Sequence, residues 1–264
     1  MSVALVTGGG RGVGRVIAIA LAEVGYDVAV ASRTSAELAE TAAGVEALGR
    51  RAFYRVADVT DEAAVDALLP AVEAALGAID VLVNNAGTAA GIGPAWELDV
   101  DLWWRDIESS VRSTFLCSRG VLPGMIRRGS GRIVNVSSYV AVRPSPYLSG
   151  YAAAKAAVTS FSEGLAAAVA EHGIAVFTIT PGLFQSEITA RLIESEEGRR
   201  WLPDVKNGRF VTAEQLKRLV AFVVSDRAAP FSGRFLHALD DLDDLAARSE
   251  EIVRDDLFTV KLRR

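Results

Sequence analysis

The chain has 264 residues, half of them apolar, a formal net charge of −5 at pH 7, one cysteine and two histidines. This composition suits one α/β domain with a large core, and it disfavours both a metal site and a nucleic-acid partner, which requires a strongly basic surface. The N-terminus lacks a basic signal segment and no apolar run reaches the roughly 18 residues that span a bilayer, so we expect a cytoplasmic protein without a membrane partner.

A glycine-rich turn at residues 7–14 follows the first predicted strand, 3–6, and precedes a helix at 15–22. The turn has the pattern T-G-x-x-x-G-x-G. A strand, a glycine turn and a helix start together direct backbone N–H groups and the positive helix end at a pyrophosphate, although a plain glycine-rich turn has the same composition. The turn residues expected to contact such a ligand are Gly8, Arg11, Gly12, Val13 and Gly14.

The second predicted strand, 27–33, ends in Ser32 and Arg33 without a carboxylate. A carboxylate at this position would accept the 2′-OH of an adenosine ribose, whereas an arginine favours a 2′-phosphate. Since Arg11 stands in the neighbouring turn, the sequence predicts NADP(H) in preference to NAD(H). The alternative for Arg33 is a solvated turn residue.

Two further polar turns follow predicted strands. The third strand, 52–56, is followed by Asp58, which either contacts an adenine amino group or caps a helix at 61–76. The fourth strand, 81–83, ends in the run Asn84-Asn85-Ala86-Gly87. These amides can satisfy backbone groups of neighbouring turns, and the alternative is a plain Asn-Gly-type turn.

The later predicted elements are a long helix at 100–128, a fifth strand at 131–136 and a sixth strand at 175–180. Trp103 and Trp104 cannot face the same way on a helix, so we expect one in the core and the other at a subunit interface. Pro181 and Gly182 end the sixth strand. Strands and helices alternate throughout, which predicts a single α/β domain over 1–264, a doubly wound parallel sheet with helices on both faces.

Tyr151 and Lys155 lie four residues apart in an alanine-rich stretch. In a helix these positions share one face. A free tyrosine titrates near ~10, and a neighbouring cation lowers that pKa, which would let the phenol exchange protons nearer neutral pH. The alternative is an ordinary surface pair.

Taken together, these motifs resemble the classical short-chain dehydrogenase/reductase family over about residues 2–235. The matching features, in the order and spacing of the family, are Thr7-Gly8-x3-Gly12-x-Gly14, Asn84-Asn85-Ala86-Gly87, Ser138 thirteen residues before Tyr151, Tyr151-x3-Lys155 and Pro181-Gly182. The resemblance implies a Rossmann fold, a metal-free NAD(P)(H) site, hydride transfer between the cofactor and a carbonyl or alcohol substrate, and a homodimer or homotetramer.

The resemblance also implies residue roles. Tyr151 would be the general acid or base, Lys155 would hold the nicotinamide ribose and lower the Tyr151 pKa, and Ser138 would hydrogen-bond the developing oxyanion. Asp58 would contact adenine, and Asn85 the ribose region. The remaining cofactor contacts implied are Val59, Ala86, Gly87, Pro181, Gly182, Phe184 and Ser186, the last at the nicotinamide carboxamide.

Three features depart from the family pattern. Ser110 occupies the position of an asparagine that supports a proton relay from the lysine, and its reach is shorter, which puts turnover in question. Ser186 replaces a threonine but keeps the hydroxyl. The tail, 239–264, lacks the usual Gly-Gly segment and is expected to form one acidic helix, packed on its own domain or on a partner subunit. The apolar side of that helix would contain Leu239, Leu242, Leu245, Ile252 and Leu257.

Residues 185–211 occupy the position of the family's substrate lid. Trp96 and Trp201 either line an apolar substrate pocket or only pack the lid, and Arg143 either attracts an acidic group or is solvated. We therefore expect an NADP(H)-dependent reductase of a ketone such as a 3-oxoacyl or polyketide-like compound. The alternatives are a non-redox enzyme of the same fold, such as a cyclase or dehydratase, and a cofactor-sensing protein.

Overall fold

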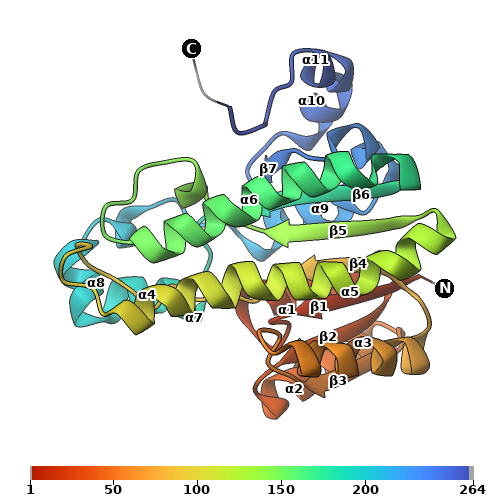
Figure 1. Ribbon diagram of the computed structural model, residues 1–264, viewed down its shortest axis with the longest axis horizontal. Coiled ribbons are helices and arrows are strands. Elements are labelled where there is room, and N and C mark those ends of the chain that lie inside the picture. The colour runs from red at the N-terminus through yellow and green to blue at the C-terminus, as the bar shows by residue number, and fades with distance from the viewer. Residues whose placement is uncertain (1, 262–264) are drawn as a thin grey trace.

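The computed structural model in Figure 1 describes residues 2–261, which contain one sheet of seven parallel strands. The strands run in the order β3-β2-β1-β4-β5-β6-β7. Their bounds are β1 Val3–Thr7, β2 Asp27–Ser32, β3 Ala52–Val56, β4 Ile79–Asn84, β5 Gly131–Val136, β6 Ile174–Thr180 and β7 Phe235–His237. This topology confirms the predicted doubly wound parallel sheet.

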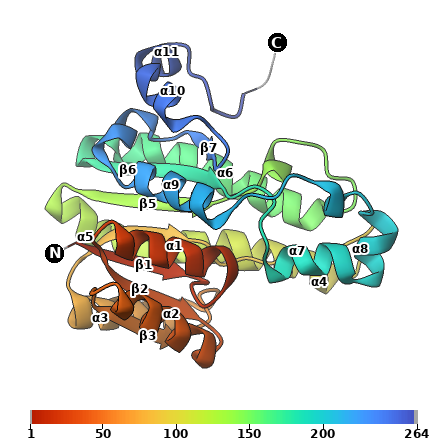
Figure 2. The ribbon, with the colours of Figure 1, turned by 180° about the vertical axis from the view of Figure 1, so that it is seen from behind.

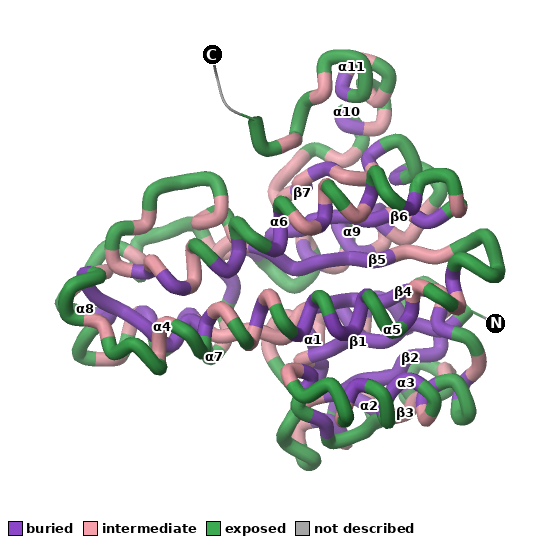
Figure 3. Tube along the Cα trace, in the orientation of Figure 1, coloured by how far each residue is buried: buried purple, intermediate pink, exposed green. Residues whose placement is uncertain are grey.

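Helices cover both faces of the sheet. The main ones are α1 Gly12–Glu23, α2 Ser35–Ala47, α3 Glu62–Leu76, α4 Val100–Ile107, α5 Ser113–Arg128, α6 Ser149–Val169 and α9 Ala213–Val223. Helices α3, α5 and α6 pack on one face (Figure 1), and α1, α2 and α9 pack on the other (Figure 2). Because both faces are covered, the central strands are mainly apolar, and Figure 3 shows them largely buried while the outer sides of the helices are exposed.

The strand order reverses between β1 and β4, which pair with each other in parallel. The connections after these two strands therefore leave toward opposite faces of the sheet, and a crevice opens between them at the carboxyl ends. The glycine turn after β1 and the Asn-Asn-Ala-Gly run after β4 meet there. Among the described residues, no helix combines the length and the apolar character needed to cross a membrane.

The predicted helix at 100–128 consists of α4 and α5 joined by a π-helical turn, Glu108–Arg112. A π-helical turn is rare and often marks a functional site, because the extra residue redirects side chains. Here it contains Ser110, which is buried. Trp103 and Trp104 face different ways as predicted: the first donates from Nε1 to the Ser149 hydroxyl at 3.2 Å, and the second is exposed.

The prediction of one helix in the tail is wrong. The described part forms two short helices, α10 Leu242–Ala247 and α11 Ser249–Arg254, because the backbone leaves the helical region at Arg248. The bend lets Leu245 and Ile252 enter the core of their own chain, whereas Leu257 stays partly exposed. Residues 262–264 of the predicted tail lie outside the described residues.

Candidate active site

A cavity of about 440 Å³ opens at the carboxyl ends of β1, β2 and β4. The structure brings all the residues predicted to contact a cofactor to its wall. They are Gly8, Arg11, Gly12, Val13, Gly14, Ser32, Arg33, Asp58, Val59, Asn85, Ala86, Gly87, Tyr151, Lys155, Pro181, Gly182, Phe184 and Ser186. Of the predicted catalytic residues, Ser138 and Ser110 are not among the residues that line this cavity.

The glycine turn forms a close backbone cradle. A Cβ atom on Gly14 would lie 2.1 Å from the Gly8 carbonyl oxygen, so only glycine fits there, and Gly8 and Gly12 have the positive φ angles of +62° and +52°. Arg11, the N-cap residue of α1, makes no capping hydrogen bond with its side chain. The first N–H groups of α1 are therefore open to an anion, which fits a pyrophosphate.

Asn85 holds this turn in place. Its Nδ2 atom donates to the carbonyl oxygens of Thr7 and Gly8, at 3.0 and 3.1 Å, and the Thr7 hydroxyl accepts from the backbone N–H groups of Asn85 and Ala86. The prediction that an amide here satisfies the backbone of a neighbouring turn is confirmed. The ribose contact implied for Asn85 stays a prediction.

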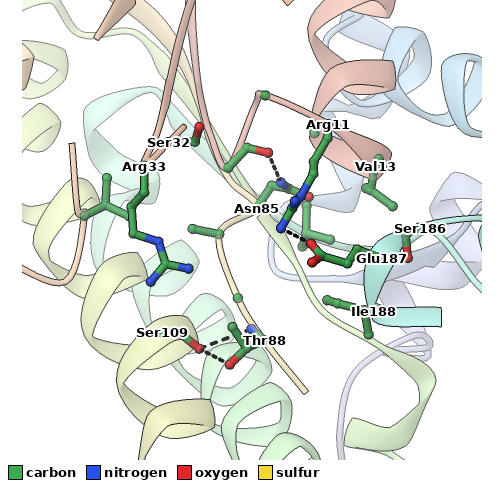
Figure 4. Close-up of a pocket in the computed structure, with 18 of the residues that line it drawn as sticks. Arg11, Val13, Ser32, Arg33, Asn85, Thr88, Ser109, Ser186, Glu187 and Ile188 are labelled. Carbon is green, nitrogen blue, oxygen red and sulfur yellow. Dashed lines mark hydrogen bonds and ion pairs between the residues drawn. The ribbon is translucent and has the colours of Figure 1, made fainter. Parts of the chain in front are cut away.

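Charged side chains surround the end of the cavity next to β2 (Figure 4). Arg33 points into the cavity, and within residues 2–261 it forms no ion pair. Arg11 lies between two carboxylates: it donates to Glu37 Oε1 at 2.9 Å and pairs with Glu187. Sequence reasoning missed Glu37, which comes from α2 and lines the cavity.

Asp58 lies on the same wall, and its alternative role as a helix cap is wrong. The cap of α3 is Asp61, whose side chain accepts from the Ala63 N–H. Asp58 Oδ1 instead accepts from the N–H and the hydroxyl of Thr60, at 3.0 and 2.7 Å. Burial raises the pKa of Asp58, but the Thr60 hydrogen bonds and the nearby Arg33 charge together outweigh burial and hold this pKa below its usual range, so the group is an ionised acceptor.

Tyr151 and Lys155 share one face of α6, as predicted. Lys155 is only 4% exposed, and its Nζ atom donates to the Val136 carbonyl oxygen at 2.8 Å. Burial lowers the pKa of Lys155 to about 8, against the opposing effect of the Asp106 charge. At neutral pH the side chain is therefore still mostly an ammonium ion.

Overall the pKa of Tyr151 is raised, and the lowering effect expected of Lys155 stays a prediction. Burial raises the pKa of Tyr151 to about 12; a hydrogen bond with Ser138 opposes this effect and the Asp106 charge adds to it. The Lys155 ammonium lies 5.7 Å from the centre of the Tyr151 ring and is directed to a backbone carbonyl. Tyr151 is accordingly a protonated phenol at neutral pH, which is the form that donates a proton.

A second cavity of about 590 Å³ lies on the other side of Tyr151. Ser138 lines it, together with residues from β7 and from the segment after β6. The residues that line both cavities are Tyr151, Gly182, Ile188 and Thr189. Tyr151 therefore lies where the two cavities meet, so a molecule in either one can approach the phenol.

Two buried polar groups, Ser110 and Asp106, lie next to the site. Ser110 is buried, and its hydroxyl has no hydrogen-bond partner among the described residues. Asp106, four residues earlier, is a buried carboxylate that sequence reasoning missed. It accepts from the Thr88 hydroxyl at 2.8 Å and from the backbone N–H groups of the next turn, Ala90 and Gly91, and so fixes the loop after β4. Its helical spacing from Ser110 is the signal that would have revealed it.

The segment 185–211 contributes lining residues to both cavities, and its role as a lid stays a prediction. It contains α7 Glu187–Glu194, capped by Ser186, and α8 Glu196–Trp201. Arg191 of α7 donates to the Ala90 carbonyl oxygen at 2.8 Å, which ties the segment to the loop after β4. The Trp201 ring packs against Tyr147 at 4.9 Å between ring centres. Trp96, in contrast, is 83% exposed.

These features agree with the comparison to known proteins. A family model described as short chain dehydrogenase matches residues 2–197. The chain belongs to this family. The sequence-based prediction of the family is confirmed, and the family is one of oxidoreductases that use nicotinamide cofactors.

Three relatives illustrate the range of the family. The 3-oxoacyl-acyl-carrier-protein reductase of Escherichia coli K12 is 34% identical over 235 residues, which are 89% of this chain and 94% of that protein. An NADPH-bound variant of actinorhodin polyketide ketoreductase superposes with a TM-score of 0.81 at 32% identity, covering 89% of this chain and 95% of the other. NAD⁺-bound xylitol dehydrogenase also gives 0.81, at 28% identity, covering 89% and 96%.

Proposed function

We propose that the protein reduces a ketone to an alcohol with NADPH, with Tyr151 as the general acid. The observation that carries this proposal is the position of Tyr151 at the junction of two cavities. One cavity has a glycine cradle suited to a dinucleotide, and the other is open to a second molecule. A proton donor between them can act on a carbonyl oxygen while its carbon faces the cofactor.

Bound NADPH would supply the hydride. The open N–H groups at the start of α1 would bind the pyrophosphate, Asp58 would accept from the adenine amino group, and Ser186 would bind the nicotinamide carboxamide. The Lys155 ammonium would bind the nicotinamide ribose, since Lys155 lines the same cavity and stays charged near neutral pH.

The proton transfer depends on Tyr151 and Ser138. Burial keeps the Tyr151 phenol protonated, and the charge that develops on the carbonyl oxygen in the transition state accepts its proton. The Ser138 hydroxyl, which hydrogen-bonds Tyr151 and lines the second cavity, would donate to the same oxygen and stabilise that charge.

Arg33 supports a preference for NADP(H). Its guanidinium faces the cavity at the end of β2, free of ion pairs among the described residues, and is suited to a 2′-phosphate. Glu37 favours the second candidate, NAD(H), because a carboxylate at this end of the cavity can accept a ribose 2′-OH. Glu37 is already paired with Arg11, whereas Arg33 forms no ion pair among the described residues.

The second cavity supports a ketone with apolar substituents, such as a 3-oxoacyl or polyketide-like compound. Its apolar lining residues are Val140, Leu148, Leu183, Ile188, Leu192 and Val205. Two of the relatives are named as reductases of such compounds. We further propose a homodimer or homotetramer, because Trp104 and Phe115 are about half exposed on the helices α4 and α5.

The test is calorimetric titration of the purified protein with NADPH and with NADH, followed by oxidation of bound NADPH with a panel of ketones. The proposal predicts tighter binding of NADPH and loss of its absorbance with at least one ketone. Tight binding without oxidation over a broad panel would instead support a non-redox enzyme or a cofactor sensor. Equal or tighter binding of NADH would show that Glu37 outweighs Arg33.

A further inference from the structure

Neighbouring polar side chains form one wall of the second cavity. Four polar side chains form this wall: Tyr139, Arg143, His237 and Asp240. Two of them, His237 and Asp240, come from β7 and the turn that follows it, in the part of the chain that departs from the family pattern. The cavity therefore offers hydrogen-bonding groups beyond Ser138 and Tyr151.

His237 is placed by the sheet. It is the last residue of β7 and pairs in register with Thr180 of β6, so its ring lies beside Gly182, which follows β6. A Cβ atom on Gly182 would lie 3.1 Å from Cε1 and 3.2 Å from Nε2 of the ring. Because Gly182 lines both cavities, the imidazole is close to the junction at which Tyr151 lies.

The hydrogen bonds of the ring determine its tautomer. His237 Nδ1 accepts from the Leu239 N–H at 2.9 Å. An accepting ring nitrogen carries no proton, so in the neutral imidazole the proton is on Nε2. Burial lowers the pKa of His237, which favours this neutral form, against the opposing effect of the Asp240 charge. Among residues 2–261, Nε2 has no hydrogen-bond partner, so its N–H is available to a ligand.

The charges on the wall balance one another. The Arg143 guanidinium lies 4.2 Å from the centre of the Tyr139 ring, and the His237 ring meets the same ring edge-on at 5.7 Å. Asp240 Oδ2 accepts from the His237 backbone N–H at 2.7 Å. One cation and one carboxylate on the same wall favour a neutral oxygen acceptor over a carboxylate.

We propose that His237 is a specificity-determining residue, whose Nε2–H donates a hydrogen bond to a neutral oxygen of the substrate other than the carbonyl oxygen that is reduced. This proposal rests on the proposed function, because it assumes that the second cavity holds the ketone. The substrates selected would be ketones with a second carbonyl or ester group, in preference to alkyl ketones of the same length.

The test compares two ketones of equal chain length, ethyl 3-oxobutanoate and 2-heptanone, in the wild type and in two variants of His237. Asparagine places its amide near the position of Nδ1, so His237→Asn keeps an acceptor for the Leu239 N–H but loses the distant donor. Glutamine places its amide near the position of Nε2, so His237→Gln keeps the distant donor. The intrinsic reactivities of the two ketones cancel when the ratios of kcat/KM are compared between proteins.

For His237→Asn we expect the ester-to-ketone ratio of kcat/KM to fall roughly tenfold, as for loss of one hydrogen bond, with the value for 2-heptanone nearly unchanged. For His237→Gln the ratio should stay close to that of the wild type. If His237 acted only by accepting from the Leu239 N–H, the ratio would change more in His237→Gln than in His237→Asn. An unchanged ratio in His237→Asn, or an equal loss on both ketones, would overturn the proposal.

Failure of the proposed function is distinguishable from failure of this inference. If the wild type oxidises NADPH with neither ketone, the reductase proposal fails, and binding of the two compounds to the protein with NADP⁺ is measured by calorimetry instead. Weaker binding of the ester by His237→Asn, by roughly tenfold, would still support the role of His237. Equal binding of the ester by wild type and variant would refute it.

Discussion

The two cavities that meet at Tyr151 are built in different ways. The first has a wall of backbone: glycines that approach a ligand closely, the start of α1, and an asparagine that braces the turn. The second is bounded by side chains from segments far apart in the sequence, which β6, β7 and the segment 185–211 bring together. A backbone wall tolerates little change at a few positions, whereas a side-chain wall changes with each substitution.

The largest effect on cofactor binding is expected at Gly14, where the neighbouring backbone leaves no room for a side chain. Gly14→Val places a side chain against the Gly8 carbonyl oxygen, 2.1 Å from the position of Cβ, and should abolish NADPH binding in calorimetry. Gly164→Ala in α6 is the control, since nothing lies within 4 Å of its Cβ position, and should leave binding unchanged and stabilise the helix by about 0.5–1 kcal/mol. Normal NADPH binding by Gly14→Val would refute the role of the turn.

At the charged end of the first cavity, Arg33→Ala should weaken NADPH binding roughly ten- to a hundredfold, as for loss of a hydrogen bond to a charged group, and leave NADH binding unchanged. Arg55→Ala, an exposed arginine on β3 that is not among the residues lining the cavity, is the charge-matched control. Glu37→Gln separates the two cofactor candidates. It should weaken NADH binding if the carboxylate holds a ribose 2′-OH, and should not weaken NADPH binding if Arg33 selects the cofactor.

Lys155 connects the site to the pH dependence of stability. Its pKa is lowered to about 8 in the folded protein, so between about 8 and the ordinary value of 10.5 the unfolded chain binds more protons. Stability from this group therefore rises with pH through that window. The free energy of unfolding of the wild type minus that of Lys155→Met, from urea titrations at pH 7.5 and 10, should increase by on the order of 1 kcal/mol or more. The subtraction removes the contributions of Tyr151 and Cys117, whose raised pKa values act in both proteins. If the difference in free energy of unfolding between the wild type and Lys155→Met were the same at both pH values, the burial of a charged lysine would be contradicted.

The smallest effect is expected at Ser110, whose buried hydroxyl lacks a partner among the described residues. An asparagine there has a longer reach toward Lys155, because the Ser110 hydroxyl and the Lys155 Nζ atom lie 2.9 and 3.3 Å from the same point, the position of a Cβ atom on Gly87. Ser110→Asn should raise kcat severalfold at saturating NADPH without changing the KM for NADPH. Ser110→Ala controls for the loss of the hydroxyl alone, and a lower kcat in Ser110→Asn than in Ser110→Ala would count against a relay.

The contrast between a cavity with a backbone wall and a cavity with a side-chain wall also determines what the sequence could predict. The sheet and the first cavity follow from local patterns, because buried strands, glycines and turn residues have fixed spacings. Glu37 and His237 escaped because each reaches the site from an element whose tertiary position no local spacing encodes. Helical spacing likewise places Tyr151 and Lys155 on one face, but it encodes neither the burial that raises the Tyr151 pKa nor the Val136 carbonyl that accepts from Lys155.

The most direct test of the central claim is single-turnover oxidation of bound NADPH by ethyl 3-oxobutanoate in the wild type and in Tyr151→Phe. Phenylalanine keeps the ring between the two cavities and removes only the hydroxyl. The account predicts an unchanged Kd for NADPH and a rate of hydride transfer that falls roughly 10²–10⁴-fold. A variant that binds NADPH and oxidises it at the wild-type rate would show that Tyr151 is not the proton donor.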